Sequence, residues 1–370
     1  MSADFISLAL PCVQQLSPYV PGKPIEELAR ELNLDPCNIV KLASNENPLG
    51  PSTRVLAAIN QHLQDVNRYP DGNGFALKSK LAQRIGVSVD RLVLGNGSSD
   101  VLDMCAHAYL EPGSNVVFSQ YSFAMYSLVA QARGTLGKAV KAKDYGHDLD
   151  AMLAAIDADT RVVYVANPNN PTGTWFGTAQ WERFIAAVPE QVLVVLDEAY
   201  IEFALREVDL PDGLNYIERY PNLLVTRTLS KAYGLAGLRV GYGVGSPAVV
   251  DVLNRVRQPF NVNGLALVAA VAALDDKEHL ARSLELNRVG KAQLLEGLAA
   301  LGLAWVPSCC NFVMVGFGQP VDQLCKALLA EGGIVRPMAG YGLPNHLRVS
   351  VGLELENRRF LEAMAKVLGR

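Results

Sequence analysis

Six short apolar runs, separated by helical patterns, constrain the fold of this chain more than any other feature. The runs are RLVLG (91–95), NVVFS (115–119), RVVYVA (161–166), QVLVVLDEA (191–199), NLLVTRT (222–228) and RVGYGV (239–244). The runs do not alternate with polar residues, which is typical of strands buried on both faces of a sheet. Helical patterns such as SSDVLDMCAHAYL and GTAQWERFIAAV lie between them. The sequence therefore predicts an α/β fold, with a mostly parallel central sheet covered on both sides by helices.

The alternation of apolar runs and helical patterns ends after residue 265. We expect one long helical segment at 265–301, two short strands near 303–315, a helix at 320–331, a strand at 346–352 and a C-terminal helix. This part predicts a smaller α+β domain, completed by the first 45 residues with their prolines and glycines. The predicted division is a large domain at 46–265 and a small domain made of 1–45 and 266–370, which a chain of 370 residues is long enough to form.

Composition excludes several classes of protein. A formal net charge of -4 argues against a nucleic-acid binder that depends on a basic field. The six cysteines form no CxxC motif and have no histidine at metal-ligand spacing, so we expect free thiols and no metal site. The longest small-apolar run, 264–274, is about half of the ~20 residues that a membrane span needs, and no signal peptide is evident. The sequence predicts a soluble cytoplasmic protein without nucleic-acid or membrane partners.

Polar residues follow two of the predicted strands. In LGNGSSDVLD (94–103), Ser98 or Ser99 is in a position to cap a helix whose free N–H groups would bind a phosphate; an ordinary capped turn is the alternative. In NPNNPTG (167–173), two prolines fix the turn and leave Asn170 at the edge of the sheet, although a plain β-turn would also explain the motif. Ligands of α/β proteins bind at such strand ends.

A carboxylate ends the most apolar strand. Asp197 closes the run VLVVLD and Tyr200 follows three residues later. Burial there would raise the pKa of the Asp197 carboxyl unless a cation stabilised the ionised form. An ordinary ion pair or a helix N-cap is the alternative explanation.

Residues 226–242, TRTLSKAYGLAGLRVGY, place a lysine among hydroxyls and glycines. Thr228, Ser230 and Arg239 have the groups to bind a phosphate, and Lys231 on the same turn is either a reactive amine or a loop lysine. The four segments together suit one ligand with a phosphate, a ring nitrogen, a ring oxygen and an aldehyde. That ligand is pyridoxal 5'-phosphate.

The ordered motifs NPNNPTG, DEAY and SKAYGLAGLRVGY resemble those of the fold-type I pyridoxal-phosphate-dependent aminotransferases. Over nearly the whole chain the wider resemblance is to the histidinol-phosphate aminotransferase family, through SPYVPGKP (17–24), KLASNENPLGPS (41–52), NRYPDGNG (67–74) and the pair VRP and LRVSVG (335–352). The first set is specific for the cofactor, and the second is less specific for the substrate.

The resemblance implies roles for the cofactor residues. Lys231 would bond covalently to the cofactor aldehyde and move a proton, and Asp197 would hold the ring nitrogen protonated. Asn170 and Tyr200 would bind the ring's 3'-oxygen. The phosphate would be bound by Thr228, Ser230, Arg239 and the N–H groups of Ser98 and Ser99. Phe123 would stack on the ring, where many relatives have tyrosine.

The resemblance also implies a homodimer in which Tyr69 reaches the cofactor phosphate and substrate of the neighbouring subunit. Arg336 and Arg348 would bind the phosphate of histidinol phosphate or a carboxylate of 2-oxoglutarate or glutamate. Tyr19, Asn45 and Asn170 would line the same pocket. Without the resemblance, Phe123 and Tyr69 are explained as core aromatics, and Arg336 and Arg348 as solvent-exposed arginines in salt bridges.

The function this implies is reversible amino transfer from glutamate to imidazole acetol phosphate, in L-histidine biosynthesis. An aromatic amino-acid aminotransferase and a decarboxylase of a phosphorylated amino acid are the enzymatic alternatives. A non-catalytic sensor would be expected to lack part of the set Lys231, Asp197, Tyr200, Asn170 and Arg239, all of which are present. An NAD-binding enzyme is poorly supported, because GYGVG (241–245) lacks the GxGxxG spacing.

Overall fold

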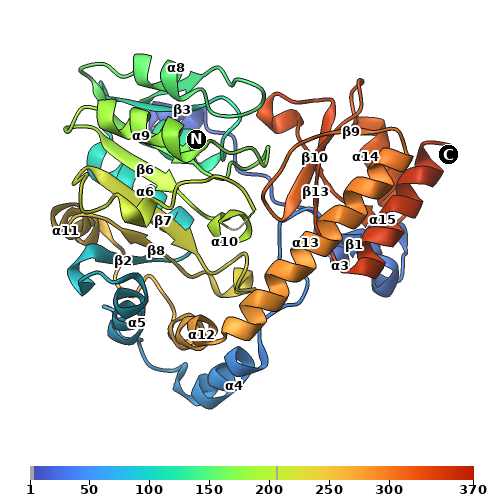
Figure 1. Cartoon of the computed structure of the whole chain (residues 1–370), viewed down its shortest axis with the longest axis horizontal. Helices are drawn as coiled ribbons and strands as arrows, with labels where there is room; N and C mark the ends of the chain where they lie inside the picture. The colour runs from blue at the N-terminus through green and yellow to red at the C-terminus, as the bar shows by residue number, and fades with distance from the viewer. Residues whose placement is uncertain (1–3, 206) are drawn as a thin grey trace.

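A seven-stranded sheet forms the larger part of the protein (Figure 1), in a computed structural model that describes residues 4–205 and 207–370. The strands are β2 (Leu92–Gly95), β3 (Asn115–Ser119), β4 (Leu136–Val140), β5 (Thr160–Ala166), β6 (Leu193–Asp197), β7 (Leu223–Thr228) and β8 (Gly241–Val244). Their order is β2-β8-β7-β6-β5-β3-β4, and only β8 runs antiparallel to its neighbours. The predicted α/β class and mostly parallel sheet are confirmed.

The six apolar runs all form strands close to the predicted bounds, but the sequence reading missed β4. This strand, LGKAV, lies at the edge of the sheet, and none of its residues is fully buried. An edge strand that is not covered on both faces has no need of a continuous apolar run, so the pattern used for the other strands does not detect it.

Helices cover both faces of this sheet, as predicted. On one face lie α4 (Thr53–His62), α5 (Phe75–Ile85), α8 (Leu149–Ala154), α9 (Thr178–Ala187) and α12 (Gly264–Asp275); on the other lie α6 (Ser98–Tyr109), α7 (Met125–Ala132) and α11 (Pro247–Val256). Successive side chains of a strand point to opposite faces. In β6, Val194 and Leu196 therefore join the first core, while Leu193 and Val195 join the second.

A smaller antiparallel sheet stands beside the large one, in the order β12-β13-β10-β9 (Figure 1). Its strands are β9 (Ala304–Val306), β10 (Phe312–Gly316), β12 (Arg336–Pro337) and β13 (His346–Ser350), and it packs with α13 (Lys277–Ala300), α14 (Asp322–Ala330) and α15 (Glu354–Val367). From the N-terminal region, β1 (Val40–Lys41) pairs in parallel with β11 (Gly333–Ile334), and α3 (Ile25–Leu32) packs nearby. The predicted contribution of the N-terminal residues to this part begins at α3.

The prediction of one helix over 265–301 is wrong. The helix breaks at Asp276, whose side chain accepts a hydrogen bond from the backbone N–H of His279 (3.0 Å) and so starts α13. The preceding helix α12 contributes Ala266 and Ala270 to the core of the large sheet. The predicted division of the chain into two domains stays a proposal, and the packing of α12 favours a boundary near Asp276 rather than at 265.

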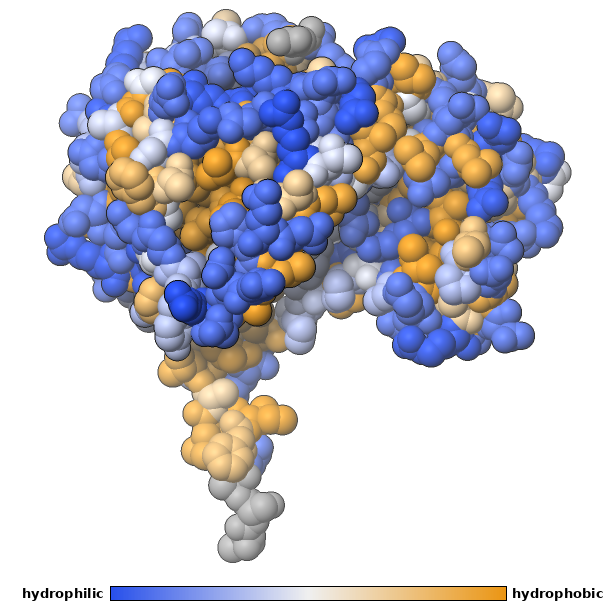
Figure 2. All heavy atoms as spheres, turned by 90° about the horizontal axis from the view of Figure 1, so that it is seen from below, coloured by the Kyte–Doolittle hydropathy of each residue, from blue (hydrophilic) through white to orange (hydrophobic). Residues whose placement is uncertain are grey.

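The most N-terminal helices, α1 (Phe5–Leu8) and α2 (Pro11–Gln14), project from the body as an apolar arm (Figure 2). Phe5, Ile6 and Leu8 on this arm are largely exposed. Its contact with the body is to the large part, where Cys12 Sγ donates to the carbonyl of Ala132 at the end of α7 (3.7 Å).

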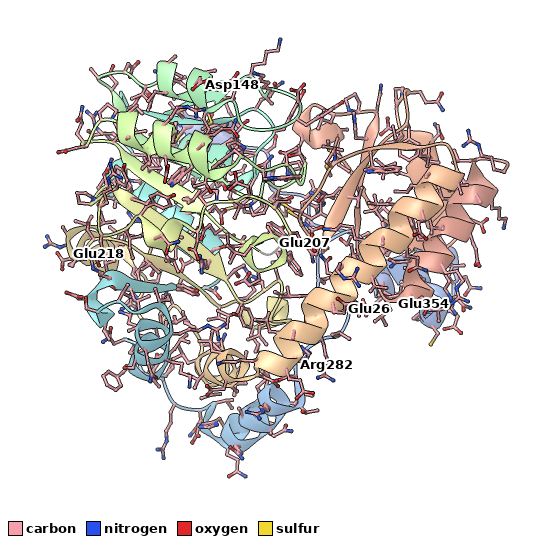
Figure 3. The ribbon with its side chains drawn as sticks, viewed as in Figure 1. Glu26, Asp148, Glu207, Glu218, Arg282 and Glu354 are labelled. Carbon is pink, nitrogen blue, oxygen red and sulfur yellow. The ribbon has the colours of Figure 1, made fainter. Side chains whose placement is uncertain are left out.

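The remaining short helices are α10 (Ile201–Ala204) and the 3₁₀ turns η1 (Pro36–Asn38), η2 (Leu63–Asp65), η3 (Val89–Arg91), η4 (Gly213–Asn215), η5 (Ala236–Leu238) and η6 (Ala339–Tyr341). Just after α10, Glu207 lies beside α13 (Figure 3) and accepts a hydrogen bond from Lys291 of that helix at 3.0 Å. This ion pair joins the large part of the molecule to the helix that leads into the small sheet.

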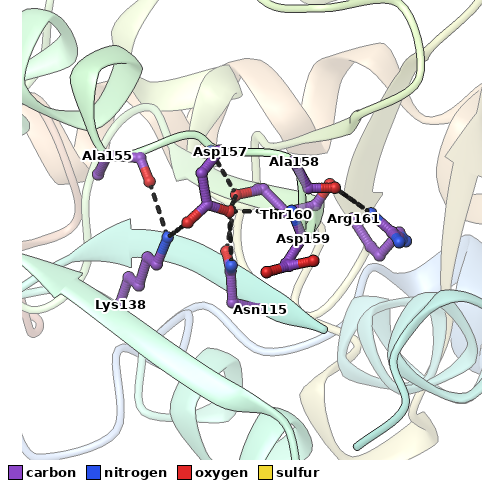
Figure 4. Close-up of polar contacts among 8 residues, drawn as sticks. All are labelled: Asn115, Lys138, Ala155, Asp157, Ala158, Asp159, Thr160 and Arg161. Carbon is purple, nitrogen blue, oxygen red and sulfur yellow. Dashed lines mark hydrogen bonds and ion pairs between the residues drawn. The ribbon is translucent and has the colours of Figure 1, made fainter. Parts of the chain in front are cut away.

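A polar cluster connects the amino-terminal ends of β3 and β5 with the middle of β4 (Figure 4). The Asp157 carboxylate accepts hydrogen bonds from Lys138 Nζ, from Asn115 Nδ2 (2.8 Å) and from Thr160 Oγ1 (3.1 Å). Lys138 also donates to the carbonyl of Ala155 (3.1 Å). We call these side chains the Asp157 cluster. Each finds its partners within the cluster or the adjacent backbone.

Within residues 4–205 and 207–370, no helix combines the length and the apolarity that crossing a membrane requires. Across the same residues, His, Cys, Asp and Glu side chains form no group of three or more that could hold a metal ion.

Candidate active site

One cavity collects almost every residue that the sequence singles out. It lies beyond the carboxyl ends of β5, β6 and β7, between the large sheet and residues from β12, β13 and the N-terminal segment. The predicted residues that line it are Tyr19, Asn45, Ser98, Ser99, Phe123, Asn170, Asp197, Tyr200, Thr228, Ser230, Lys231, Arg239, Arg336 and Arg348. Parallel strands bring their ends to the same edge of a sheet, which explains why segments so far apart in the sequence meet here.

Lys231 has its amine in this cavity without an anionic partner among the described residues. Its Nζ donates to the carbonyl of Ser44 at 3.4 Å and lies 5.5 Å from the centre of the Tyr200 ring. Burial, and then the nearby positive charge of Arg348, lower the pKa of Lys231 to about 8. The amine therefore loses its proton at a lower pH than an ordinary lysine does, and the unprotonated amine is the state that attacks an aldehyde.

Asp197 presents a buried carboxylate at the end of β6. Its Oδ2 accepts from Tyr126 OH (2.8 Å) and its Oδ1 from Thr226 Oγ1 (3.1 Å). Burial raises the pKa of this carboxyl, while the hydrogen bonds from Tyr126 and Thr226 and the charge of Lys231 oppose the rise. A cationic ring nitrogen in the cavity would further favour the ionised form.

The sequence reading missed Tyr126 and Thr226 as supports of Asp197. Tyr126 belongs to the segment FAMY (123–126), but only Phe123 was assigned a role there. Its ring stacks on Tyr164 of β5 at 4.8 Å between ring centres, which fixes the direction of the hydroxyl. In the β6–β7 ladder, Thr226 is the residue directly beside Asp197. Sequence spacing does not show either neighbour.

The start of α6 and the loop after β7 form a cradle with the properties of a phosphate site. A Cβ at Gly97 would collide with the Arg239 guanidinium, and one at Gly241 would collide with the backbone N of Ser98. Glycine at both positions therefore leaves space for donors to lie close together. Arg239 Nη1 lies 3.4 Å from Ser230 Oγ, and the Ser230 N–H donates to Thr228 Oγ1 at 3.1 Å.

Arg239 is held in the left-handed backbone conformation, with φ at 58°. This conformation costs an L-residue roughly 1–2 kcal/mol, and such strain is concentrated at functional sites. The prediction that Ser98 or Ser99 caps α6 is wrong, because the N-cap is Gly97, which has no side chain to accept a hydrogen bond. Both serines lie in the first turn, where an uncapped helix start offers its N–H groups to an anion.

Hydrogen bonds from neighbouring residues orient two polar side chains in the cavity, Tyr200 and Asn170. Tyr200 OH accepts from Asn45 Nδ2 at 2.9 Å, so its own proton remains free to be donated. Burial raises the pKa of the Tyr200 hydroxyl, which keeps it protonated. Asn170 Oδ1 accepts from Arg348 Nη1, which turns the amide nitrogen of Asn170 away from the arginine.

Two arginines from the small sheet complete the cavity. Arg348 on β13 is buried; it donates to Asn170 and to the carbonyl of Ala43 (2.8 Å), and its Nε has no hydrogen-bond partner among the described residues. Arg336 on β12 is partly exposed, with its guanidinium carbon 5.4 Å from the centre of the Tyr19 ring. Two guanidinium groups that share one cavity are suited to bind phosphate or carboxylate.

Phe123 lines the cavity, and its ring packs edge-on against Tyr126 with 6.1 Å between the ring centres. Tyr69 does not line the cavity of its own chain. Tyr69 is 82% exposed, and its ring stacks on Phe260, with 4.6 Å between ring centres, in an apolar groove formed with α4, α5 and α12. The prediction that Tyr69 acts in a neighbouring subunit stays a prediction.

The donor set of the cavity fits pyridoxal 5'-phosphate. The glycine-lined cradle with Arg239 suits the phosphate, and the buried carboxylate of Asp197 suits a protonated ring nitrogen. Asn170 and Tyr200 have donors for a ring oxygen, and Lys231 has an amine for the aldehyde. The roles of the individual residues remain predictions.

A family model described as aminotransferase class I and II matches residues 38–364. The match covers both sheets and every cavity residue except Tyr19 and Gly22. Together with the cavity lysine and the phosphate cradle, it defines the class of the protein as an aminotransferase.

Similar proteins narrow this class. The chain is 63% identical to "Histidinol-phosphate aminotransferase 2" of Pseudomonas fluorescens strain Pf0-1, over 100% of both chains, and 63% identical to that of Pseudomonas aeruginosa PAO1, over 99% of both. A crystal structure of histidinol-phosphate aminotransferase from Sinorhizobium meliloti, in complex with pyridoxal 5'-phosphate, has a TM-score of 0.88 at 30% identity and covers 98% of each chain. The chain belongs to the histidinol-phosphate aminotransferase family.

The fold is shared with enzymes named for another substrate. A mutant aspartate aminotransferase of Thermus thermophilus has a TM-score of 0.85 at 25% identity, covering 97% of this chain and 99% of its own. The substrate must therefore be argued from the cavity and from the more similar sequences rather than from the fold.

Proposed function

We propose that this protein catalyses reversible amino transfer between L-histidinol phosphate and 2-oxoglutarate, giving imidazole acetol phosphate and L-glutamate, as a step of L-histidine biosynthesis. The observation that carries the proposal is the pair Arg336 and Arg348 in the cavity of Lys231, because both substrates must place an anion at one site. The names of the relatives at 63% identity support the same substrates. We propose pyridoxal 5'-phosphate as the cofactor, supported by its presence in the Sinorhizobium meliloti structure.

In this proposal each side chain around the cofactor has a separate role. Bound pyridoxal phosphate supplies an electron sink for the negative charge that forms at the substrate Cα. Lys231 would move a proton from the substrate Cα to C4' of the cofactor in the first half-reaction and in the opposite direction in the second, for which an amine with a lowered pKa is suited. Asp197 keeps a proton at the ring nitrogen. Tyr200 and Asn170 donate to the ring oxygen, in the orientations set by Asn45 and Arg348.

The two arginines bind the part of the substrate that does not react. Arg348 presents its guanidinium to the cavity while keeping the hydrogen bond that orients Asn170. Arg336, partly exposed beside Tyr19, adds the second guanidinium. A phosphate on histidinol phosphate and a carboxylate on 2-oxoglutarate or glutamate meet the same donors, so one site serves both half-reactions.

A single-turnover experiment tests the substrate. The protein loaded with pyridoxal phosphate is mixed with histidinol phosphate or with phenylalanine, and the cofactor absorbance is followed. We expect rapid conversion with histidinol phosphate and slow conversion with phenylalanine. The reverse order would move the function to aromatic amino-acid metabolism, and release of carbon dioxide would identify a decarboxylase.

We further propose a cytoplasmic homodimer in which Tyr69 of each subunit reaches the cofactor phosphate and substrate of the other. Support comes from the exposed Tyr69–Phe260 stack and from the apolar groove around it. All six cysteines are free thiols, as expected in a reducing compartment.

Co-expression of two inactive variants tests the shared site. If Tyr69 acts across subunits, mixed dimers of Tyr69→Ala and Lys231→Ala contain one intact site and regain activity. Absence of activity in mixed dimers that have been isolated would contradict the shared site.

A further inference from the structure

The ends of β6 and β7 carry a second set of charged side chains on the face turned away from the cavity. Alternation along the strands puts Asp197, Thr226 and Thr228 on the cavity side and Glu198 and Arg227 on the other. Glu198 is fully buried, and Arg227 is nearly so. None of the steps described above uses these two residues.

Arg227 and Glu198 form an ion pair, and Asp212 is its third member. Arg227 Nε donates to Glu198 Oε2 at 2.8 Å, Nη2 lies 2.7 Å from the same oxygen, and Nη2 donates to Asp212 Oδ1 at 2.6 Å. The other oxygen of Glu198 accepts from the backbone N–H of Gly213 at 2.7 Å. A Cβ at Gly213 would lie 2.9 Å from that oxygen, so glycine is needed for this approach. We call these residues the Glu198 clamp.

The clamp fixes the same two strand ends that form the cofactor site. The backbone N–H of Glu198 donates to the carbonyl of Thr226 at 2.9 Å, next to the 3.1 Å hydrogen bond from Thr226 Oγ1 to Asp197. A shift of β6 relative to β7 would therefore move Asp197 away from Thr226 and change its position in the cavity. The ion pair between Glu198 and Arg227, which joins the two strands, opposes that shift.

We propose that Glu198 and Arg227 are positioning residues, which hold Asp197 where it meets the ring nitrogen of the cofactor from the opposite face of the sheet. This inference rests on the proposed cofactor. The alternative is that the clamp stabilises the fold alone, as a buried ion pair in any protein does when one partner is removed.

The test measures ligand affinity rather than activity. Apoprotein is titrated with pyridoxal 5'-phosphate and with 4'-deoxypyridoxine 5'-phosphate, which has the ring nitrogen and the phosphate but no aldehyde to react with Lys231. We expect Glu198→Gln to weaken the binding of both ligands by about tenfold, the lower end of what loss of a supporting contact costs a site. Lys231→Ala should weaken chiefly the binding of pyridoxal phosphate.

Asp157→Asn is the matched control, because it removes a hydrogen-bonded carboxylate from the same sheet at the opposite strand ends (Figure 4). It should lower the melting temperature and leave both affinities unchanged. The double variant Glu198→Gln/Arg227→Met removes both fully or nearly buried charges and leaves Asp212, which is partly exposed to solvent, without its arginine. It should fold, with the weakened affinities of Glu198→Gln.

Unchanged affinities in Glu198→Gln, wild-type affinities in the double variant, or an equal weakening in Asp157→Asn would each overturn the inference while leaving the proposed function intact. A wild-type protein that binds neither ligand would overturn the proposed function and this inference together.

Discussion

Asp157 lies just before β5 and bonds to Lys138 in the middle of β4 and to Thr160 at the start of β5. At the other end of the sheet, Asp197 and Thr226 lie near the carboxyl ends of β6 and β7, and β7 leads to Lys231. The side-chain types are the same, but their surroundings differ. In the Asp157 cluster, hydrogen bonds, first of all from Lys138, hold the pKa of the Asp157 carboxyl well below its usual range. In the cavity, burial raises the pKa of Asp197 and lowers that of Lys231.

The difference lies in whether the lysine and the aspartate form an ion pair with each other. Lys138 donates directly to Asp157, whereas Asp197 is bonded to Tyr126 and Thr226 and Lys231 forms no ion pair with any described residue. An amine and a carboxylate that are kept apart in a buried site remain available to a ligand. The same residue types thus serve stability at one end of the sheet and chemistry at the other.

The largest expected contrast is between the two lysines. Lys231→Ala should lower the rate of amino transfer by about 10⁴-fold, because a positioned group that transfers protons contributes up to this factor. Lys138→Ala should leave the rate unchanged. Steady-state kinetics with histidinol phosphate and 2-oxoglutarate measure both, and a near-normal rate in the Lys231→Ala enzyme would refute the role of Lys231.

The two aspartates should differ next most. Asp197→Asn removes the charge that holds the ring nitrogen protonated, and we expect kcat to fall by roughly 10²–10³-fold, the usual cost of losing a preorganised electrostatic contact. Asp157→Asn should retain the wild-type kcat. If both substitutions lower kcat equally, the contrast between the strand ends is lost.

The contrast between cavity residues and residues outside the cavity can also be tested at Arg348, which is proposed to bind the substrate. In Arg348→Lys the charge stays but the fork of donors is lost, so KM for histidinol phosphate and for 2-oxoglutarate should both rise by roughly 10–100-fold, as expected for a charged hydrogen bond. Arg358→Lys, on an exposed pair with Glu354, is the control and should have no effect. A rise for only one substrate would mean that the two anions use different sites.

The lowered pKa of Lys231 predicts a pH dependence of the stability of the apoprotein. Between about pH 8 and the pKa of 10.5 of an unfolded lysine, the unfolded chain binds more protons at this residue than the folded chain does. This residue therefore makes the folded state gain stability as pH rises through that window. Relative to Lys231→Met, the wild-type free energy of unfolding should increase by roughly 1–3 kcal/mol.

Urea unfolding of both apoproteins at about pH 7.5 and about pH 10, on either side of most of that window, measures this difference. The variant itself controls for the titration of all other groups. An equal pH dependence in the two proteins would show that Lys231 has an ordinary pKa.

The smallest effect is expected at the Asp157 cluster. Lys138→Met removes a partly exposed ion pair, and such pairs contribute little to stability, so we expect a small decrease in melting temperature without any change in cofactor affinity. A calorimetric scan measures it. A large decrease would mean that this cluster holds the sheet together more strongly than its exposure indicates.

The sequence predicted the residues that line the cavity better than it predicted the residues that hold them in place. Lys231, Asp197 and Asn170 follow buried strands whose apolar runs are easy to find, and motifs in the chain mark them. Tyr126 lies 71 residues before Asp197, and its hydrogen bond depends on how α7 packs on the sheet, which no local pattern encodes. The pairing of Glu198 with Arg227 follows from strand register, and that too is a property of the assembled sheet.

The errors in the fold have similar causes. The edge strand β4 lacks an apolar run because it is not buried on both faces, unlike β2 at the other edge. The break between α12 and α13 was missed although Asp276 and its neighbours are a usable helix-start signal. The apolar alanines before it and the helical pattern after it resemble one continuous helix.

The segment that bears Lys231 leaves the sheet at Thr228 and returns beside it, since Thr228 and Gly241 are paired residues of β7 and β8. Both ends of residues 229–240 are therefore anchored to the same rung of the ladder. The length of this connection is therefore constrained as well as its chemistry: a residue inserted between Lys231 and Arg239 would change the spacing of the amine and the guanidinium that share the cavity. An insertion at the exposed turn between α7 and β4, beside Arg133 and Gly134, would not change this spacing. Libraries that vary loop length in this protein should therefore avoid this hairpin, even where they leave every functional residue in place.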